Sequence, residues 1–172
     1  ESNRLNRVIS ELLNYARPLE LNLEPLSIQT LFEDTIRMIA LEKEAAGIEI
    51  TQEIEPGLPP VPLDRDRMLQ VLLNLAQNSV DAMPTGGKLT LKAAQLVARQ
   101  GIQIIVQDTG AGIPESALPR LFDPFFTTKA RGTGLGLALV RKIVDSHGGE
   151  VEVQSEEGVR TRVVLTLPQS DW

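Results

Sequence analysis

The chain has 172 residues, a formal net charge of −6 and no cysteine, and only 3% of its residues are aromatic. This length suits one well-filled core rather than two domains, and the lack of cysteine excludes disulfide frameworks, thiolate zinc sites and cysteine nucleophiles. The negative charge argues against a nucleic-acid partner, because phosphate backbones select basic surfaces. No apolar run reaches the roughly 20 residues of a bilayer span, so we expect any membrane spans of a longer parent protein to lie in other segments.

Residues 2–17 predict an amphipathic helix that ends at Pro18. Its apolar side chains follow the i, i+3, i+4 spacing of one helix face. The members of this stripe are Leu5, Val8, Ile9, Leu12, Leu13 and Ala16. A short isolated helix is marginal in water, so the stripe needs a partner. The pattern alone leaves two interpretations open: a helix packed on its own domain, or half of a coiled-coil-like hairpin whose other half is missing.

The next elements are a helix, a strand and a loop. A helix is predicted for 27–46, because Ser27 is a suitable N-cap and Gly47 a suitable stop. Residues 48–54 alternate between apolar and polar side chains, which indicates a strand. The prolines of 56–62 then predict a stiff loop.

The middle of the chain predicts one helix and two strands. Asp64 can cap a third helix over 65–83, and strands follow at 88–97 and 102–108, with a turn near Gly101.

The last third begins with a long stretch, 109–134, that is rich in glycine and proline and shows one short helical turn around 115–121. Loops of this length are usually functional or disordered. A helix at 135–147 and a hairpin of strands at 150–155 and 160–167 complete the chain. Strands joined by a hairpin cannot be parallel, so we expect a mixed sheet with helices on one face, a two-layer α/β sandwich.

A row of polar side chains lies along one face of the third helix. Gln70, Asn74, Asn78 and Asp81 are spaced for a single face and are surrounded by apolar residues. A solvated helix face is one interpretation, but such faces usually carry Lys, Glu and Arg, and Asn is a weak helix former. The other interpretation is a binding site in which the amide oxygen of Asn78 is a ligand of a magnesium ion that accompanies a nucleotide.

The strand at 102–108 ends in a carboxylate, and the segment 108–114, DTGAGIP, follows directly. Glycines permit positive φ and let a ligand approach the backbone closely. A carboxylate fixed at a strand end, here Asp108, can accept a hydrogen bond from an exocyclic amine such as that of adenine. A simple Asp-Thr-Gly turn is the alternative.

Segment 132–137, GTGLGL, opens the fourth helix, and a helix N-terminus with free N–H groups is suited to binding phosphate. It matches neither the P-loop nor the dinucleotide pattern. Segment 122–129, FDPFFTTK, lies just before it, and its paired phenylalanines predict that it folds against the body or over a ligand. Lys129 and Arg131 are either phosphate contacts or solvated loop cations.

In this order, the four segments resemble those of sensor histidine kinases, within the ATPase superfamily shared with DNA gyrase, the ninety-kilodalton heat-shock chaperone and the MutL mismatch-repair proteins. The resemblance covers about residues 20–168. Among sensor kinases, the sequence most resembles the nitrogen-regulator and metal-responsive branch. The matching segments are the asparagine box at 70–83, the first glycine box at 108–114, the phenylalanine box at 122–129 and the second glycine box at 132–140.

The resemblance implies the two-layer Bergerat-type ATP-binding fold, with ATP and Mg²⁺ as cofactors. It implies that Asn78 holds the metal, that Asp108 binds the adenine amine, and that segment 123–133 is a mobile lid. The residues that it places around the nucleotide are Asn74, Asn78, Asp81, Asp108, Gly110, Gly112, Ile113, Thr128, Lys129, Gly132, Thr133, Gly134, Leu135, Gly136, Leu137 and Thr161.

Two departures from the family pattern stand out. Arg160 occupies a position where the family has glycine, so the turn before Thr161 is expected to differ in shape. No phosphoacceptor histidine box is present, and the single histidine, His147, is followed by two glycines at a helix end. We expect His147 to have a structural role.

The resemblance further implies that residues 1–18 are the end of the second helix of a dimerisation hairpin and that 19–172 are the catalytic ATP-binding domain. The expected activity is transfer of the ATP γ-phosphate to a histidine of the dimerisation domain, in a homodimer, for relay to a response-regulator receiver domain. We expect a cytoplasmic domain of a parent protein at the inner membrane, and a chain that cannot phosphorylate itself.

The main alternative is an ATP-hydrolysing module of the chaperone or topoisomerase type. Those relatives carry a glutamate base four residues before the magnesium asparagine, and here that position is Asn74. An anti-sigma serine kinase is a further alternative, which the helical stub at 4–17 disfavours. A scaffold without nucleotide is another, which the four intact segments disfavour.

Overall fold

The computed structural model describes residues 1–42, 45 and 47–169. The helices are α1 (Ser2–Ala16), α2 (Ile28–Ile39), α3 (Arg65–Asp81) and α4 (Gly136–Ser146), with 3₁₀ turns η2 (Val97–Arg99) and η3 (Glu115–Arg120). The strands are β1 (Glu24–Leu26), β2 (Ile48–Ile54), β3 (Val61–Leu63), β4 (Gly87–Leu96), β5 (Gly101–Asp108), β6 (Glu150–Glu156) and β7 (Arg160–Pro168).

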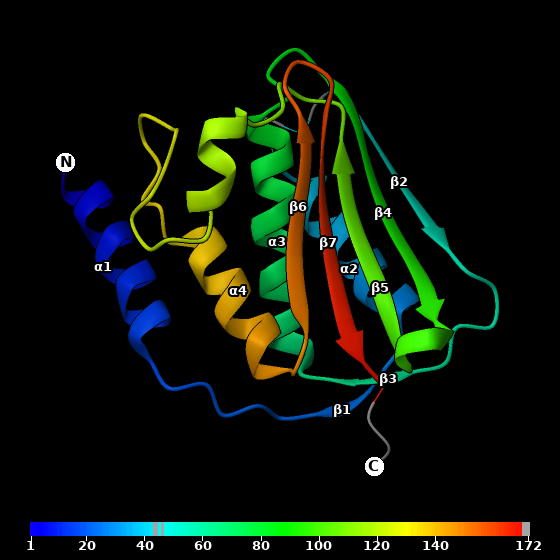
Figure 1. Cartoon of the computed structure of the whole chain (residues 1–172). Coiled ribbons are helices and arrows are strands. Elements are labelled where there is room, and N and C mark those ends of the chain that lie inside the picture. The colour runs from blue at the N-terminus through cyan, green and yellow to red at the C-terminus, as the bar shows by residue number, and fades with distance from the viewer. Residues whose placement is uncertain (43–44, 46, 170–172) are drawn as a thin grey trace.

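The main sheet has the strand order β2-β4-β5-β7-β6, and only the β2–β4 pair is parallel. Helix α2 packs on β2, α3 on β4 and β5, and α4 on β6, so these helices form one layer against one face of the sheet (Figure 1). The mixed sheet, the two layers and the final hairpin that the sequence predicts are confirmed.

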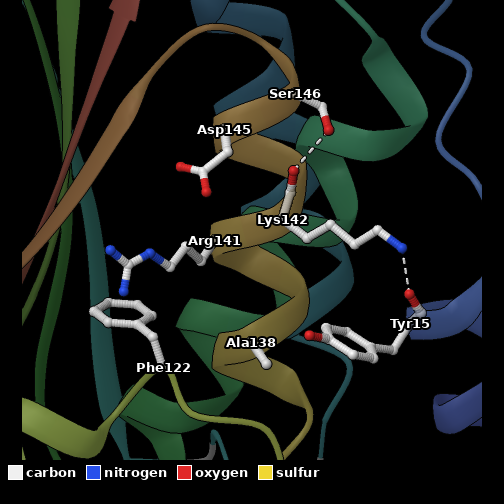
Figure 2. Close-up of a pocket in the computed structure, with 7 residues that line it drawn as sticks. All are labelled: Tyr15, Phe122, Ala138, Arg141, Lys142, Asp145 and Ser146. Atoms are coloured by element: carbon white, nitrogen blue, oxygen red, sulfur yellow. Dashed lines mark hydrogen bonds between the residues drawn. The ribbon is translucent and has the colours of Figure 1, made fainter.

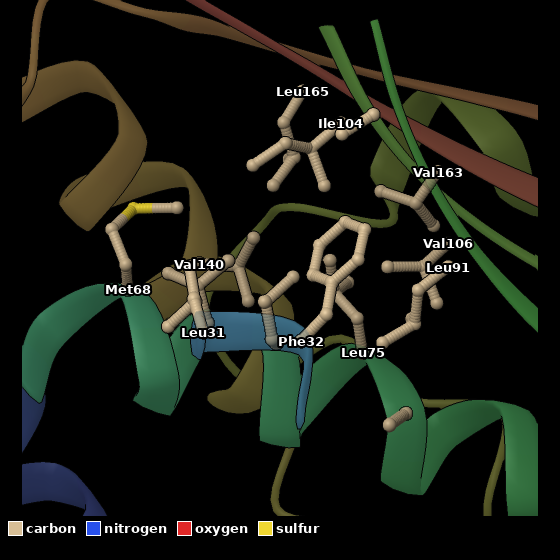
Figure 3. Packing of buried hydrophobic residues seen from close by; sticks show 14 of the residues in the cluster. Leu31, Phe32, Met68, Leu75, Leu91, Ile104, Val106, Val140, Val163 and Leu165 are labelled. Atoms are coloured by element: carbon tan, nitrogen blue, oxygen red, sulfur yellow. The ribbon is translucent and has the colours of Figure 1, made fainter. Parts of the chain in front are cut away.

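The core lies between these two layers. Figure 3 shows Phe32 of α2 and Leu75 of α3 pointing toward Leu91, Val106 and Val163 of the sheet. All five side chains are buried, and burial of each large apolar side chain contributes about 2–3 kcal/mol. The faces of α2 and α3 are therefore fixed relative to the ends of β4, β5 and β7, where the site lies.

Both predicted helix caps are present. The Ser27 hydroxyl accepts a hydrogen bond from the Thr30 N–H at 3.4 Å, and the Asp64 carboxylate accepts one from the Arg67 N–H at 3.0 Å. Side-chain caps of this kind satisfy N–H groups that have no partner inside the helix.

The prediction of one helix over 27–46 is too long. Helix α2 ends at Ile39, and Leu41 is 83% exposed in the turn that follows. Residues 40–42 are exposed, so no buried apolar face continues directly beyond Ile39 to support a further turn of helix. Residues 43, 44 and 46 of the predicted helix lie outside the described residues.

A small antiparallel sheet of β1 and β3 was not predicted from the sequence. Pro25 pairs with Pro62 at its centre, and the segment expected to be a stiff loop supplies β3. Strands of three residues show no alternation, and proline argues against a strand because it lacks an N–H donor.

Helix α1 stands to the side of the two-layer body, with α4 as its neighbouring helix (Figure 1). None of its side chains, all of which belong to the described residues, is buried, and Leu5 and Leu13 of the apolar stripe are 61% and 57% exposed. Among the described helices, none combines the length and the apolar character that crossing a membrane requires.

Candidate functional site

The two asparagines on the polar face of α3 contact the glycine-rich segment and the loop before it, whereas Gln70 accepts from Arg67 and Asp81 is exposed. Asn74 and Asn78 are half-buried, and the Asn74 side-chain amide donates to the backbone oxygen of Gly136 at 3.5 Å. The amides therefore connect α3 to the start of α4. Two side chains one turn apart on α3 thus face the loops, which is what a binding face requires.

Lys129 joins the predicted lid to the same face of α3. Its ammonium donates to Asn78 Oδ1 at 3.0 Å and to Asp81 Oδ2 at 2.6 Å. Gln77 also donates to the Asp81 carboxylate, at 2.9 Å. The Asn78 and Asp81 oxygens therefore already accept from a cation, and Lys129, expected at a phosphate, lies instead on the residue expected to hold the metal.

Asp108 is buried at the end of β5, with 3% of its surface exposed. The Gly110 N–H donates to its carboxylate at 2.9 Å. Burial raises the pKa of Asp108 because desolvation disfavours the ionised form, and the hydrogen bonds with Gly110 and Ser79 act in the opposite direction. A single buried carboxyl group with few protein donors is available to a polar ligand.

The first glycine segment is fixed by its own packing. A Cβ on Gly110 would lie 2.6 Å from the Ala82 backbone oxygen, and one on Gly112 would lie 2.4 Å from that of Glu156. Gly112 also has φ +71°, in the left-handed region. The glycines expected to admit a ligand therefore also let this segment lie against the end of α3 and against the β6–β7 hairpin.

Thr161 lies beside Asp108, because the two residues are direct partners in the β5–β7 ladder. The Thr161 and Ser155 hydroxyls are 3.0 Å apart, and Ser155 Oγ accepts from the Ile113 N–H at 2.8 Å. Arg160, which replaces the family's glycine, is an exposed residue of β7 opposite Glu156. The Arg160 substitution therefore leaves Thr161 next to Asp108.

The lid and the second glycine segment are held together by a close backbone contact. The Phe125 N–H donates to the Gly134 oxygen at 2.9 Å, and a Cβ on Gly134 would lie 2.3 Å from the Phe125 carbonyl carbon. Phe125 itself has φ +68° and is 61% exposed. The expectation that the paired phenylalanines are buried thus holds only in part. Phe126 is half-buried, and the guanidinium carbon of Arg120 lies 4.7 Å from the centroid of its ring.

The remaining predicted residues contribute in different ways. Thr133 is hydrogen-bonded to Glu11 of α1, and Leu135 N–H donates to its hydroxyl at 3.4 Å. Leu135 is buried and Leu137 packs on the core, so only their backbones can face a ligand. Gly132 lies against Thr127, and Thr128 is exposed.

His147 has the structural role predicted for it. Its Nε2 accepts from the Asp64 N–H at 3.0 Å, and its Nδ1 lies 2.8 Å from the Ile143 oxygen, where an Nδ1–H donates. Both ring nitrogens are therefore engaged, in a link between the start of α3 and the end of α4.

Ser79 and Ser155 were missed from the sequence. Each contacts a predicted residue, Asp108 and Thr161 respectively. Their only signal is position, since Ser79 directly follows Asn78 and Ser155 faces Thr161 across the hairpin.

The sequence profile of the family described as histidine kinase-, DNA gyrase B-, and HSP90-like ATPase matches residues 63–171. The sensor histidine kinase ZraS of Escherichia coli K12 is 40% identical over 168 residues, which are 98% of this chain and 36% of ZraS. Sporulation kinase E of Bacillus subtilis is 34% identical over 170 residues, which are 98% of this chain and 23% of that protein. The chain thus spans about a third or less of the length of these relatives.

Solved structures of histidine kinases share the fold. Full-length ShkA in complex with AMPPNP superposes with a TM-score of 0.87 at 29% identity, covering 98% of this chain and 36% of ShkA. ThkA in complex with the response regulator protein TrrA gives a TM-score of 0.82 at 27% identity, covering 98% of this chain and 48% of that one.

Proposed function

Since the chain belongs to the family of histidine kinase-, DNA gyrase B-, and HSP90-like ATPases, we propose that it is the ATP-binding catalytic domain of a sensor histidine kinase. The observation that carries this proposal is the buried carboxyl group of Asp108 beside Thr161, at the edge where α3 meets both glycine segments, through Asn74 and through Ala82 at its C-terminal end. The curated relatives named above, which are kinases, support it.

We assign the adenine base to Asp108. A buried carboxylate accepts hydrogen bonds but donates none, so it suits a base that presents a donor, such as the exocyclic amine of adenine. Gly112 and Ile113 form the backbone beside it, and the Thr161 hydroxyl is within the same ladder pair. The phosphates then lie along residues 132–137, where the free N–H groups at the start of α4 attract anions.

The oxygens around Asn78 suit a magnesium ion. Asn78 Oδ1 and the Asp81 carboxylate already accept hydrogen bonds from one cation, the Lys129 ammonium. Mg²⁺ prefers oxygen ligands of this kind. We therefore assign the metal to Asn78, with Asp81 beside it. Bound together with ATP, the ion would neutralise phosphate charge. We assign Lys129 to a phosphate of the bound nucleotide.

Phosphoryl transfer depends mainly on positioning and charge neutralisation, and the residues named above supply both. We propose that the acceptor is a histidine of a dimerisation domain, that residues 1–18 are the end of that domain's second helix, and that 19–172 form the catalytic domain. The full protein would act as a homodimer, pass its phosphate to a response-regulator receiver domain, and keep this domain on the cytoplasmic side, where ATP is found.

Both ring nitrogens of His147 are hydrogen-bonded, which supports the proposal that the chain by itself does not autophosphorylate. Asn74 occupies the position where chaperone-type relatives carry a glutamate base, and its amide donates to the Gly136 oxygen. An amide cannot act as a base toward water, so this residue disfavours an ATPase.

Calorimetric titration with ADP, with and without magnesium, tests the proposal. Asp108→Ala should weaken ADP binding by about tenfold to a hundredfold, because a hydrogen bond to a charged group contributes roughly 1.5–3 kcal/mol. The matched control is Asp66→Ala, which removes an exposed carboxylate in the first turn of α3, at the end away from Asp108. This variant should bind like the wild type. Equal affinity of the Asp108→Ala and wild-type chains would refute the adenine assignment.

The reaction itself is tested by adding a separate histidine-bearing hairpin to the chain with labelled ATP. Acid-labile phosphate should form on the hairpin and none on this chain. Release of free phosphate without labelling of the hairpin would favour the ATPase alternative.

A further inference from the structure

Glu11 and Tyr15, which lie one turn apart on the same face of helix α1, both contact the body. The Glu11 carboxylate accepts a hydrogen bond from the Thr133 hydroxyl. The Lys142 ammonium of α4 donates to the Tyr15 backbone oxygen, lies 5.3 Å from the Tyr15 ring centroid, and donates to the Arg17 oxygen at 3.0 Å. Figure 2 shows this second contact, with Lys142 reaching from α4 to the Tyr15 backbone oxygen.

The first contact falls within the segment to which we assign the nucleotide phosphates. The Thr133 hydroxyl accepts from the Leu135 N–H at 3.4 Å and donates its single proton to Glu11. A hydroxyl has one proton, so Thr133 cannot donate to Glu11 and to a phosphate oxygen at the same time.

Charge acts in the same direction as the hydrogen bond. The start of α4, three residues beyond Thr133, is the helix end that attracts anions, and the Glu11 carboxylate is an anion held beside it. Arg7 pairs with Glu11 at 2.9 Å, but its side chain is 68% exposed, so solvent screens the pair. A phosphate arriving at Thr133 would meet a carboxylate of like charge.

We propose that Glu11 makes the docking of α1 and the binding of nucleotide antagonistic. The carboxylate occupies the phosphate position at Thr133 while α1 is docked, and phosphate binding displaces it. Antagonism is reciprocal, so any movement that lifts α1 from α4 raises the affinity for nucleotide by the same factor by which nucleotide weakens docking. This inference rests on the proposed function, because it requires phosphates at Thr133.

The test compares binding of Mg-ADP and of adenosine to the whole chain. Glu11→Gln removes the charge but keeps an acceptor for Thr133, and Glu11→Ala removes both. We expect Mg-ADP to bind about threefold to tenfold more tightly to Glu11→Gln, the size of a screened charge interaction, and more tightly still to Glu11→Ala. Glu20→Gln, an exposed carboxylate in the segment after α1, is the control and should change nothing.

Adenosine separates this mechanism from a general loosening of the chain. It carries no phosphate, so its affinity should be the same for the wild type and both Glu11 variants. Amide hydrogen exchange gives the reciprocal readout: addition of Mg-ADP should speed exchange in α1 of the wild type, whereas adenosine should not.

The outcomes distinguish this inference from the proposed function. If the wild type binds Mg-ADP but neither Glu11 variant binds it more tightly, or if adenosine binding improves equally, the antagonism is refuted and the proposed function stands. If the wild type binds no Mg-ADP, the proposed function fails and the inference fails with it.

Discussion

The carboxyl group of Asp108 is buried, which favours its neutral form, yet it must be ionised to accept a hydrogen bond from the ligand without donating one. Its raised pKa means that the native chain holds this proton more tightly than the unfolded chain does. The contribution of Asp108 to stability is therefore fully present below its ordinary value of 3.8 and is lost as the pH rises through the raised native pKa.

We therefore expect Asp108→Asn to raise the unfolding temperature of the nucleotide-free chain at neutral pH. Asparagine is similar in shape, can still accept from the Gly110 N–H, and has no charge to desolvate. The gain should shrink as the pH is lowered through the raised native pKa of Asp108 toward its ordinary value of 3.8, because the protonated carboxyl group has no charge to desolvate either. Thermal unfolding of both chains across this range checks the prediction, and a gain that is independent of pH would contradict it.

Gly112 and Gly158 allow the effect of crowding to be separated from that of backbone strain. Both have positive φ, +71° and +79°, but a Cβ built on Gly112 would lie 2.4 Å from the Glu156 backbone oxygen, whereas one built on Gly158 meets no described atom within 4 Å. Gly112→Ala should lower the free energy of unfolding by about 2–4 kcal/mol, through strain and clash together. Gly158→Ala should cost about 1 kcal/mol, from strain alone. Urea unfolding measures both, and equal losses would show that the close approach at Gly112 is unimportant.

The sequence indicated Asp108, Asn78 and Lys129 because each belongs to a segment whose residue types follow one another in a recognisable order. Ser79 and Ser155 carry no such signal. A serine in a helix or strand is ordinary, and these two matter only because α3 packs on β5 and because the hairpin register places Ser155 opposite Thr161. The contact of Lys129 with Asn78 could not be predicted either, because it depends on how a glycine-rich loop folds back over α3.

His147 connects the beginning of α3 to the end of α4, two elements that are distant in the chain. Replacement by alanine leaves the Asp64 N–H without this acceptor, which should lower the free energy of unfolding by about 1–3 kcal/mol. Ser146→Ala, the neighbouring exposed hydroxyl, is the control and should cost less than about 0.5 kcal/mol. Denaturant titration of the two variants checks this, and equal small losses would remove His147 from its structural role.

Elements with long periodic patterns were predictable, and so was the short helical turn around 115–121, which is η3; the end of α2 and the β1–β3 pair were not. Helices α3 and α4 and the strands of the main sheet have the predicted types and nearly the predicted bounds. Helix α2 ends early because residues 40–42, which follow Ile39 directly, are exposed and do not pack on the core. The β1–β3 pair depends on two segments meeting across the body, with Pro25 opposite Pro62, and neither segment shows a strand pattern.

Helix α1 is attached to the rest of the molecule by few contacts. Its side chains, all described, are unburied, and it is held chiefly through Glu11, Tyr15 and Arg17. A chain without residues 1–18 should fold and lose no more than about 1–2 kcal/mol of stability, since the contacts of α1 with the body are few and only partly buried. Circular-dichroism melts check this prediction. A fall of more than about 10 °C would show that α1 belongs to the same cooperative unit as the catalytic domain.

The mixed character of the whole sheet could be predicted, because a hairpin forces one antiparallel pair. The strand order could not, because it depends on where each strand inserts, and strand types alone do not fix that. Strand β7, the last of the described strands, lies between β5 and β6 and so occupies an interior position in the sheet.

This position has a consequence for biosynthesis. While the protein is being translated, β5 keeps an open edge and β6 has no neighbour in the sheet until residues 160–168 have left the ribosome. The nascent chain therefore cannot complete its core early, and its exposed strand edges invite aggregation until then. A stalled ribosome nascent chain that ends before residue 160 should be digested readily by protease, and one that carries β7 clear of the exit tunnel should resist.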